Sequence, residues 1–322
     1  MRDRQSSAWI STALVLGIWA LLVTLVACAP AQQPLSVSGG SPGQTSLRVL
    51  AVETFLSDIA QNVAGDRLHV EALVPAGVDP HSFEPVPSDV RKVADCNVLI
   101  VNGAGLEQFL NHLLQNAGGT RLVVEASTGL TSRLPEKGEA QDEDHAHRDP
   151  HFWLDPNNVV TYVQNIREGL QRADPDGAAE YAAHADAYIR ELEELDHWVA
   201  QQVSEIPQSR RLLVTNHESF GYFADRYGFT VVGTVIPSLS TDAVPSAQDL
   251  SHLVDRMREL GVKAIFLETG SNPELAHQVA RETGIHVVTE LYTHSPSRPG
   301  GPAPTYLDMV RFNTSTIIAA LK

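Results

Sequence analysis

Residues 177–204, GAAEYAAHADAYIRELEELDHWVAQQVS, form a long helical stretch near the middle of the chain. It has no internal glycine or proline, and its apolar side chains recur at three-, four- or seven-residue spacing, at Tyr181, Tyr188, Leu192, Leu195, Val199 and Val203. This spacing predicts one apolar stripe along a helix about 40 Å long. Pro207 would end the helix. We therefore expect a stiff strut between two halves of the chain.

Strands alternate with helical patterns on both sides of this stretch. The predicted strands cover residues 47–52, 68–74, 97–102 and 121–125 in the first half and 211–215, 230–234, 264–268 and 286–290 in the second. Such alternation is typical of a parallel α/β sheet. Arg48 to Gly65 and Arg211 to Gly228 each read as strand, turn, short helix and terminal glycine. The sequence predicts two α/β lobes with mainly parallel sheets, over 47–176 and 206–322, joined by one long rigid helix over 177–205.

The N-terminus reads as a lipoprotein signal peptide over residues 1–27. Arg2 and Arg4 precede an apolar stretch that ends in small residues directly before Cys28. The alternative is an uncleaved transmembrane anchor, because the stretch approaches the roughly 20 residues of a bilayer span. Small residues before a cysteine favour cleavage and a lipid on Cys28. Residues 28–46 are rich in Pro, Ser, Gly and Gln, which predicts a flexible tether.

Composition narrows the class of protein further. The chain has 322 residues, of which 43% are hydrophobic, and a formal net charge of −16. This charge argues against nucleic acid as a partner. With Cys28 bearing lipid, Cys96 is the one cysteine left in the sequence, so no disulfide can form within the mature chain.

Four histidines stand at four separate junctions between a strand and a loop: His81, His151, His217 and His294. Aspartate and proline precede the first two, and Ser295-Pro296 follows the last. Prolines and turn residues fix the backbone where a ligand must be aimed. A single histidine in such a place is usually a turn or core residue, but four favour one transition-metal site. Four imidazoles complete a tetrahedral shell at Zn–N distances of about 2.0–2.1 Å and leave no position for an activated water.

Several ordered motifs resemble one family across residues 47–322. They are Pro80-His81-Ser82-Phe83-Glu84-Pro85, Asn102-Gly103-Ala104-Gly105-Leu106-Glu107, Asp149-Pro150-His151-Phe152-Trp153-Leu154-Asp155-Pro156, Asn216-His217-Glu218-Ser219-Phe220 and Tyr306-Leu307-Asp308-Met309. The chain resembles the zinc- and manganese-binding receptors of bacterial ABC importers, the ZnuA/TroA-type family, also known as metal-binding lipoprotein adhesins. The resemblance implies two lobes, a metal held between them, and delivery to a membrane permease powered by a cytoplasmic ATPase.

The resemblance also implies a ligand set. His81 and His151 match the family's two N-lobe ligands, and His217 matches the third, which is commonly glutamate in manganese-type members. The fourth position is usually aspartate, whereas this chain has His294 there. The alternative is that His294 turns away and that water, Glu268 or Asp308 completes the site.

Four imidazoles favour Zn²⁺ over Mn²⁺, which prefers carboxylate oxygens. Because this ligand set is neutral, nearby acids would have to balance the charge of a dication and orient the imidazole N–H groups. The candidates for this role are Glu218, Glu268, Asp308 and Asp155.

The polar loop before His151 contains His145 and His147 among acidic residues. Zinc-type members of the family often carry a longer histidine-rich loop in this region. We expect either loose capture of metal by these two histidines or a solvated loop with no such role.

We therefore expect a monomeric, extracytoplasmic solute-binding protein, anchored through Cys28 and specific for zinc, with manganese as the alternative cargo. A zinc hydrolase would need three protein ligands, an open position and a general base, for which Glu218 is a candidate. A sugar receptor would leave the four histidines unexplained, and the sequence shows no recognisable adhesive segment.

Overall fold

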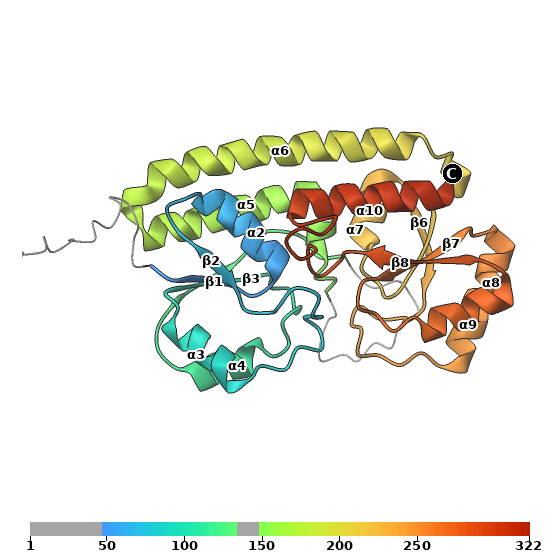
Figure 1. Cartoon of the computed structure of the whole chain (residues 1–322), viewed down its shortest axis with the longest axis horizontal. Helices are drawn as coiled ribbons and strands as arrows, with labels where there is room; N and C mark the ends of the chain where they lie inside the picture. Colours follow the sequence, from blue (N-terminus) through green and yellow to red (C-terminus); the bar gives the residue numbers. More distant parts are fainter. Residues whose placement is uncertain (1–46, 134–147) are drawn as a thin grey trace, which may run out of the picture. The chain divides into compact units, whose positions relative to one another are not determined.

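The fold is known from a computed structural model that describes residues 47–133 and 148–322, all within one compact unit (Figure 1). The predicted signal peptide over 1–27, the tether over 28–46 with Cys28, and the loop residues His145 and His147 lie outside the described residues.

The N-terminal sheet has four parallel strands in the order β2-β1-β3-β4. Their bounds are β1 Val49–Ala51, β2 Val70–Ala72, β3 Val98–Val101 and β4 Leu122–Glu125. Every residue of β1 and β3 is buried, whereas β4 alternates and lies at an edge. Continuous apolar runs such as Val98–Val101 suit central strands that helices cover on both faces.

The C-terminal sheet repeats this design with the order β6-β5-β7-β8, again all parallel. Its strands are β5 Leu212–Thr215, β6 Thr230–Thr234, β7 Ala264–Glu268 and β8 His286–Leu291. The two strand orders are equivalent, as the matching stretches that end at Gly65 and Gly228 indicated. The predicted fold class, two α/β lobes with parallel sheets, is confirmed.

Helices cover both sheets. In the first half they are α2 Thr54–Ala64, α3 Pro87–Asp95, α4 Leu110–Ala117 and α5 Pro156–Ala173, and in the second α7 Gly221–Tyr227, α8 Ala247–Leu260, α9 Glu274–Thr283 and α10 Tyr306–Leu321. Short 3-10 turns occur at Phe152–Leu154, Pro175–Gly177 and Gln208–Arg210. None of the helices in the described ranges is long and apolar enough to cross a membrane.

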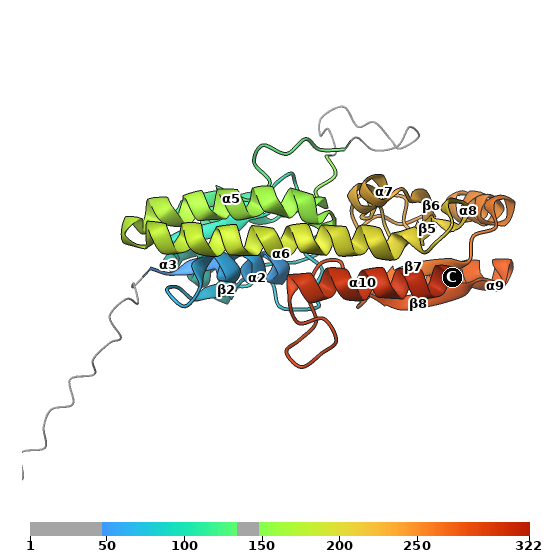
Figure 2. The ribbon, with the colours of Figure 1, turned by 90° about the horizontal axis from the view of Figure 1, so that it is seen from above.

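The long helix α6, Ala178–Ser204, joins the lobes as predicted (Figures 1 and 2). It packs against α2 and α5 of the first lobe and against α7 and α10 of the second. Its apolar stripe belongs to a single buried cluster that contains residues of both lobes. On the same helix, Asp196 accepts hydrogen bonds from Arg226 and Tyr227 of α7, with the Arg226 Nη2 to Asp196 Oδ2 distance at 2.6 Å. The strut is therefore part of the core and not a free linker.

The strand order determines where loops can form a site. In each sheet, the connections that follow the two central strands run in opposite directions. The point between these two strands is a topological switch point, and a crevice forms there at the carboxyl ends of the strands. In the second lobe, the central strands are β5 and β7, so His217, just after β5, comes close to Glu268, the last residue of β7.

Candidate metal centre

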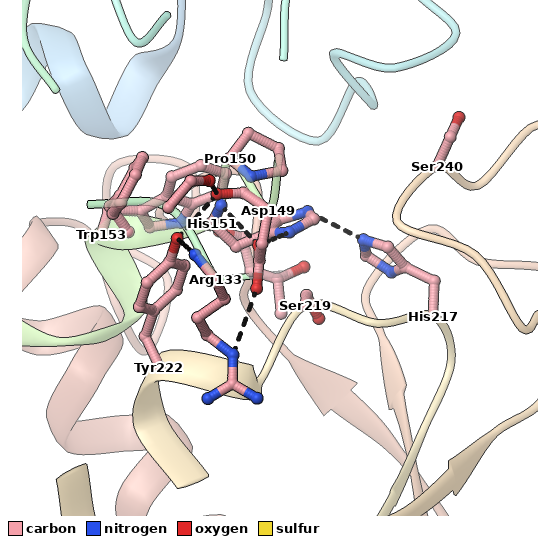
Figure 3. A network of polar contacts seen from close by, with 12 residues as sticks. Arg133, Asp149, Pro150, His151, Trp153, His217, Ser219, Tyr222 and Ser240 are labelled. Carbon is pink, nitrogen blue, oxygen red and sulfur yellow. Dashed lines mark hydrogen bonds and ion pairs between the residues drawn. The ribbon is translucent and has the colours of Figure 1, made fainter. Parts of the chain in front are cut away.

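Four histidine side chains converge between the lobes. One ring nitrogen from each of His81, His151, His217 and His294 lies within 4.8 Å of the others. The Nε2 atoms of His81 and His151 are 3.2 Å apart. Those of His217 and His151 are 3.1 Å apart (Figure 3). His151 and His217 are fully buried. Each lobe contributes two of the four imidazoles.

The two ligand candidates of the first lobe are held by the same local turn. In Asp79-Pro80-His81, the backbone N–H of His81 donates to Asp79 Oδ1 at 2.9 Å. In Asp149-Pro150-His151, the backbone N–H of His151 donates to Asp149 Oδ1 at 3.0 Å. An aspartate that accepts from the residue two positions later forms a rigid turn, and the intervening proline fixes φ. The repeated Asp-Pro-His sequence therefore sets both histidine backbones.

The two candidates of the second lobe are anchored through their neighbours. Thr215 Oγ1, at the end of β5, donates to the carbonyl of His217 at 2.9 Å. Next to His294, the carbonyl of Thr293 accepts a hydrogen bond at 2.6 Å from Nε1 of Trp153, which belongs to the first lobe. The backbone of His294 is therefore tied across the boundary between the lobes.

In three of the four rings, a carboxylate faces Nδ1, the outer nitrogen. Nε2 is the inner nitrogen of His81, His151 and His217. Asp149 Oδ1 lies 2.9 Å from Nδ1 of His151, and Glu268 Oε1 lies 2.6 Å from Nδ1 of His217. Nδ1 of His294 is 3.5 Å from Glu268 Oε2 and 3.9 Å from Asp79 Oδ1. A carboxylate in this position assigns the proton to Nδ1 and leaves Nε2 as a lone-pair donor. The inner nitrogens of His151 and His217 are thus available to bind a metal ion.

Burial keeps most of these imidazoles neutral. It lowers the pKa of His81 and of His151 well below the usual value, and neighbouring histidines add to the effect on both. Burial also lowers the pKa of His294, although Glu268 and Asp79 oppose it. His217 differs: burial lowers its pKa, but the charge of Glu268 and its contact with the ring outweigh burial, so the net shift is upward. A neutral imidazole is the form that binds metal.

The two carboxylates differ in their electrostatics. Burial raises the pKa of Glu268, but His217 and His294 lower it more strongly, to about 2. Burial raises the pKa of Asp149 to about 7, against the opposing effects of the His151 N–H and Arg133. Glu268 is therefore a permanent anion beside two rings, whereas the charge of Asp149 depends on what binds nearby.

The four acids that the sequence analysis proposed as charge partners of the metal lie in different parts of the structure. Glu268 contacts His217 and His294, as described. Asp155 accepts the N–H of Asn157 at 2.9 Å at the start of α5, and Asp308 pairs with Thr305 at the start of α10. The backbone N–H of Glu218 donates to the carbonyl of Ser238 at 2.9 Å.

Two acids at the site were not predicted, Asp79 and Asp149. Their common signal is the Asp-Pro-His sequence, in which the aspartate lies two residues before a candidate ligand.

Aromatic side chains line the inner side of the site. Trp153 is fully buried and stacks on Phe55 with ring centroids 4.4 Å apart. Tyr222 of α7 donates its hydroxyl to the carbonyl of Asp149 at 2.8 Å and accepts the backbone N–H of Arg133 at 3.0 Å (Figure 3). These contacts hold the loop of His151 against the second lobe and exclude water behind it.

Comparison with known proteins identifies this architecture. The sequence profile of the family described as "Zinc-uptake complex component A periplasmic" matches residues 49–320. The chain belongs to this family. It is 37% identical over 284 residues to the manganese-binding lipoprotein MntA of Halalkalibacterium halodurans, covering 88% of this chain and 91% of that protein. It is 29% identical over 317 residues to the metal ABC transporter substrate-binding lipoprotein SsaB of Streptococcus sanguinis, covering 95% and 98%.

Solved structures agree with this membership. The periplasmic zinc-binding protein TroA from Treponema pallidum superposes with a TM-score of 0.76 at 29% identity, covering 85% of this chain and 99% of that one. Family members are substrate-binding proteins for metal transport and not enzymes. The hydrolase alternative is therefore excluded, and the chain is a metal-binding substrate-binding protein of the ABC importer type.

Proposed function

We propose that this protein captures Zn²⁺ with His81, His151, His217 and His294 and delivers it to a membrane permease. The observation that carries the proposal is the convergence of their ring nitrogens. In a tetrahedral zinc site, ligand nitrogens lie about 3.3–3.4 Å apart, given Zn–N bonds of about 2.0–2.1 Å. The separations of 3.2 and 3.1 Å between inner nitrogens are close to this spacing.

The proton positions support a cation at the centre. With Nδ1 of His151 and of His217 each facing a carboxylate, both Nε2 atoms carry lone pairs. Two lone pairs 3.1 Å apart repel each other unless a cation or a proton lies between them. Nε2 of His294 is also buried and has no hydrogen-bond partner among the described residues. A dication would satisfy all of these atoms together.

The ligand type favours zinc over manganese. Imidazole suits Zn²⁺ and its neighbours, whereas Mn²⁺ prefers oxygen. Manganese remains the competing cargo, because MntA is named as a manganese-binding protein. Asp149 and Glu268, which face the outer nitrogens, supply two negative charges against the dication. The protein can therefore bind a divalent ion without a charged ligand in direct contact with it.

The rest of the chain suits delivery at a membrane surface. We propose that residues 1–27 are cleaved, that a lipid on Cys28 anchors the protein outside the cytoplasm, and that residues 28–46 tether it. Residues 47–176 and 206–322 act as the two lobes around the linker helix 177–205. His145 and His147 collect metal loosely before it binds. The partners are a permease and its cytoplasmic ATPase, and the receptor works as a monomer.

Competitive titration tests the cargo. The full-length protein, purified in detergent and stripped with a chelator, is titrated with Zn²⁺ and Mn²⁺. We expect one tight zinc per chain and weaker manganese. His294→Ala should weaken zinc binding strongly, and His294→Asp should shift the preference towards manganese, because it restores an oxygen ligand.

The control variant is His277→Ala, which changes an exposed histidine on α9. It should bind zinc as the unchanged protein does. A preference for manganese in the unchanged protein, or full zinc affinity in His294→Ala, would overturn the four-histidine zinc site.

A further inference from the structure

A small cavity opens beside the histidines. It has a volume of about 120 Å³ and is lined by residues 77–79 of the first lobe and by residues 268–271 and 293–295 of the second. We call this cavity the vestibule. Its lining includes His294 and Glu268, so it leads from the surface to the proposed ligands. The side chain of Asp79 is 30% exposed, against 9% for His294 and 5% for Glu268. Asp79 is therefore the carboxylate nearest to solvent.

Asp79 connects the two lobes with its two oxygens. Oδ1 accepts the backbone N–H of His81 at 2.9 Å and lies 3.9 Å from Nδ1 of His294. Oδ2 accepts the hydroxyl of Thr241 at 2.6 Å, and Thr241 belongs to the loop after β6. The short distance and the charged acceptor make this a strong hydrogen bond. The carboxylate of Asp79 thus contacts a histidine of each lobe and a loop of the second lobe.

The loop of Thr241 also contacts the loop of another ligand. The backbone N–H of Glu218, next to His217, donates to the carbonyl of Ser238 at 2.9 Å. The chain from Ser238 to Thr241 therefore links the neighbourhood of His217 with Asp79. A second bond between the lobes lies nearby, from the backbone N–H of Gly77 to Ser295 Oγ at 2.9 Å. A separation of the lobes at the vestibule would stretch both bonds.

The contact between the lobes at Trp153, on the buried side of Thr293, is held more firmly. There, Trp153 donates to Thr293, and the hydroxyl of Tyr306 donates to the carbonyl of Trp153 at 2.7 Å. These aromatic side chains belong to the buried cluster that contains residues of both lobes. Opening on that side would expose large apolar surfaces, which is costly. Opening at the vestibule would break a few polar contacts that water can replace.

We propose that the metal enters and leaves through the vestibule and that the hydrogen bond from Thr241 to Asp79 is the latch that keeps it closed. Asp79 is then a positioning residue, which controls the rate of metal release without being a ligand. This inference rests on the proposed four-histidine function. The cargo is a divalent cation, which the exposed carboxylate of Asp79 attracts on its way in and which the closed latch retains.

The test compares Thr241→Val with Thr241→Ser. The full-length protein in detergent is loaded with Zn²⁺ and mixed with excess chelator, and release is followed by tryptophan fluorescence, since the ring of Trp153 is 5.3 Å from that of His151. Valine keeps the shape of threonine but removes the hydroxyl. We expect zinc release about tenfold faster in Thr241→Val, as for the loss of a hydrogen bond to a charged group. Thr241→Ser should release zinc as the unchanged protein does.

Ser271→Ala is the matched control, because it removes a hydroxyl from the vestibule lining without touching Asp79. Its release rate should stay the same. Equal release rates in Thr241→Val and the unchanged protein would overturn the latch, and so would a Thr241→Ser variant as fast as Thr241→Val. If the unchanged protein holds no zinc at all, the proposed function itself fails.

Discussion

Oε1 of Glu268 lies 2.6 Å from Nδ1 of His217, and the two residues stand at the carboxyl ends of the central strands of the second sheet. Glu268 is the last residue of β7, and His217 follows the end of β5. The parallel order of these strands brings both to the same crevice. A carboxylate that accepts the Nδ1 proton fixes the ring's orientation and raises the basicity of Nε2. The topology thus brings a proposed ligand and the carboxylate that orients it to the same place.

Removal of this charge should weaken metal binding while the four imidazoles remain. In Glu268→Gln, the amide keeps the size of the side chain but loses the anion beside His217 and His294. We expect zinc affinity to fall about 10- to 100-fold, as for other partners of metal-bound histidines. Titration by calorimetry at neutral pH measures the change. Glu290→Gln, at an exposed position of β8, is the control. Unchanged affinity in Glu268→Gln would show that Glu268 does not support the site.

Trp153 should affect metal binding through the backbone beside His294. Its indole N–H donates to the carbonyl of Thr293, and its ring stacks on Phe55. In Trp153→Phe, the stacking partner remains but the hydrogen bond is lost, so we expect zinc affinity to fall roughly fivefold to tenfold. The smaller ring also leaves a cavity, so the midpoint of thermal unfolding should drop. Trp198→Phe, on α6 and partly buried, should leave zinc affinity unchanged. Equal zinc affinities in all three proteins would contradict this coupling.

Asp58 should make stability depend on pH. Burial raises its pKa to about 6, against a hydrogen bond from the backbone N–H of Tyr306, and the charge of Asp308 adds to the rise. The folded state binds this proton more tightly than the unfolded state does. The contribution of Asp58 to the free energy of unfolding is therefore greatest below about pH 4, falls as pH rises towards 6, and stays reduced above that pH.

Asp58→Asn keeps an acceptor for Tyr306 but has no charge to bury. We expect it to be about 3 kcal/mol more stable than the unchanged protein at pH 8 and nearly equal to it at pH 4. Denaturant unfolding at both pH values measures this difference. The exposed Asp66→Asn serves as control and should show no such dependence on pH. A stability gain that is the same at pH 4 and pH 8 would rule out ionisation as the cause.

Much of the fold follows from patterns in the sequence. The strands β6 and β7 match their predicted bounds, because turn residues delimit short apolar runs there. The ends of β1 differ from the predicted bounds, since the strand is shorter than residues 47–52. The backbone N–H of Val52 still donates to the carbonyl of Ile100, but Val52 lies outside the regular strand. Strand ends depend on partners that are distant in sequence, which local patterns do not contain.

The partners of the histidines were harder to predict than the histidines themselves. Asp155 precedes Pro156, and Asp308 stands three residues after Thr305; both are signals of helix starts. These local signals explain why Asp155 caps α5 and why Asp308 pairs with Thr305, the residue that caps α10. The contact of Glu268 with His217, in contrast, depends on the strand order, which no local pattern specifies. The hydrogen bond from Thr241 to Asp79 depends on how the two lobes pack against each other, so local sequence patterns predict it even less.

Zinc should stabilise the folded protein through its two-lobed site. A ligand that binds only the folded state raises the unfolding free energy by about 2.7 kcal/mol at a free concentration 100 times its dissociation constant. Thermal unfolding of the stripped protein with and without zinc should therefore show a higher midpoint with the metal. His217→Ala should lose most of this gain, because it removes a proposed ligand of the second lobe together with a partner of the Glu268 carboxylate. The control His286→Ala changes an exposed histidine of β8 and should keep the full gain. A zinc-induced rise of the same size in His217→Ala would place the metal elsewhere on the chain.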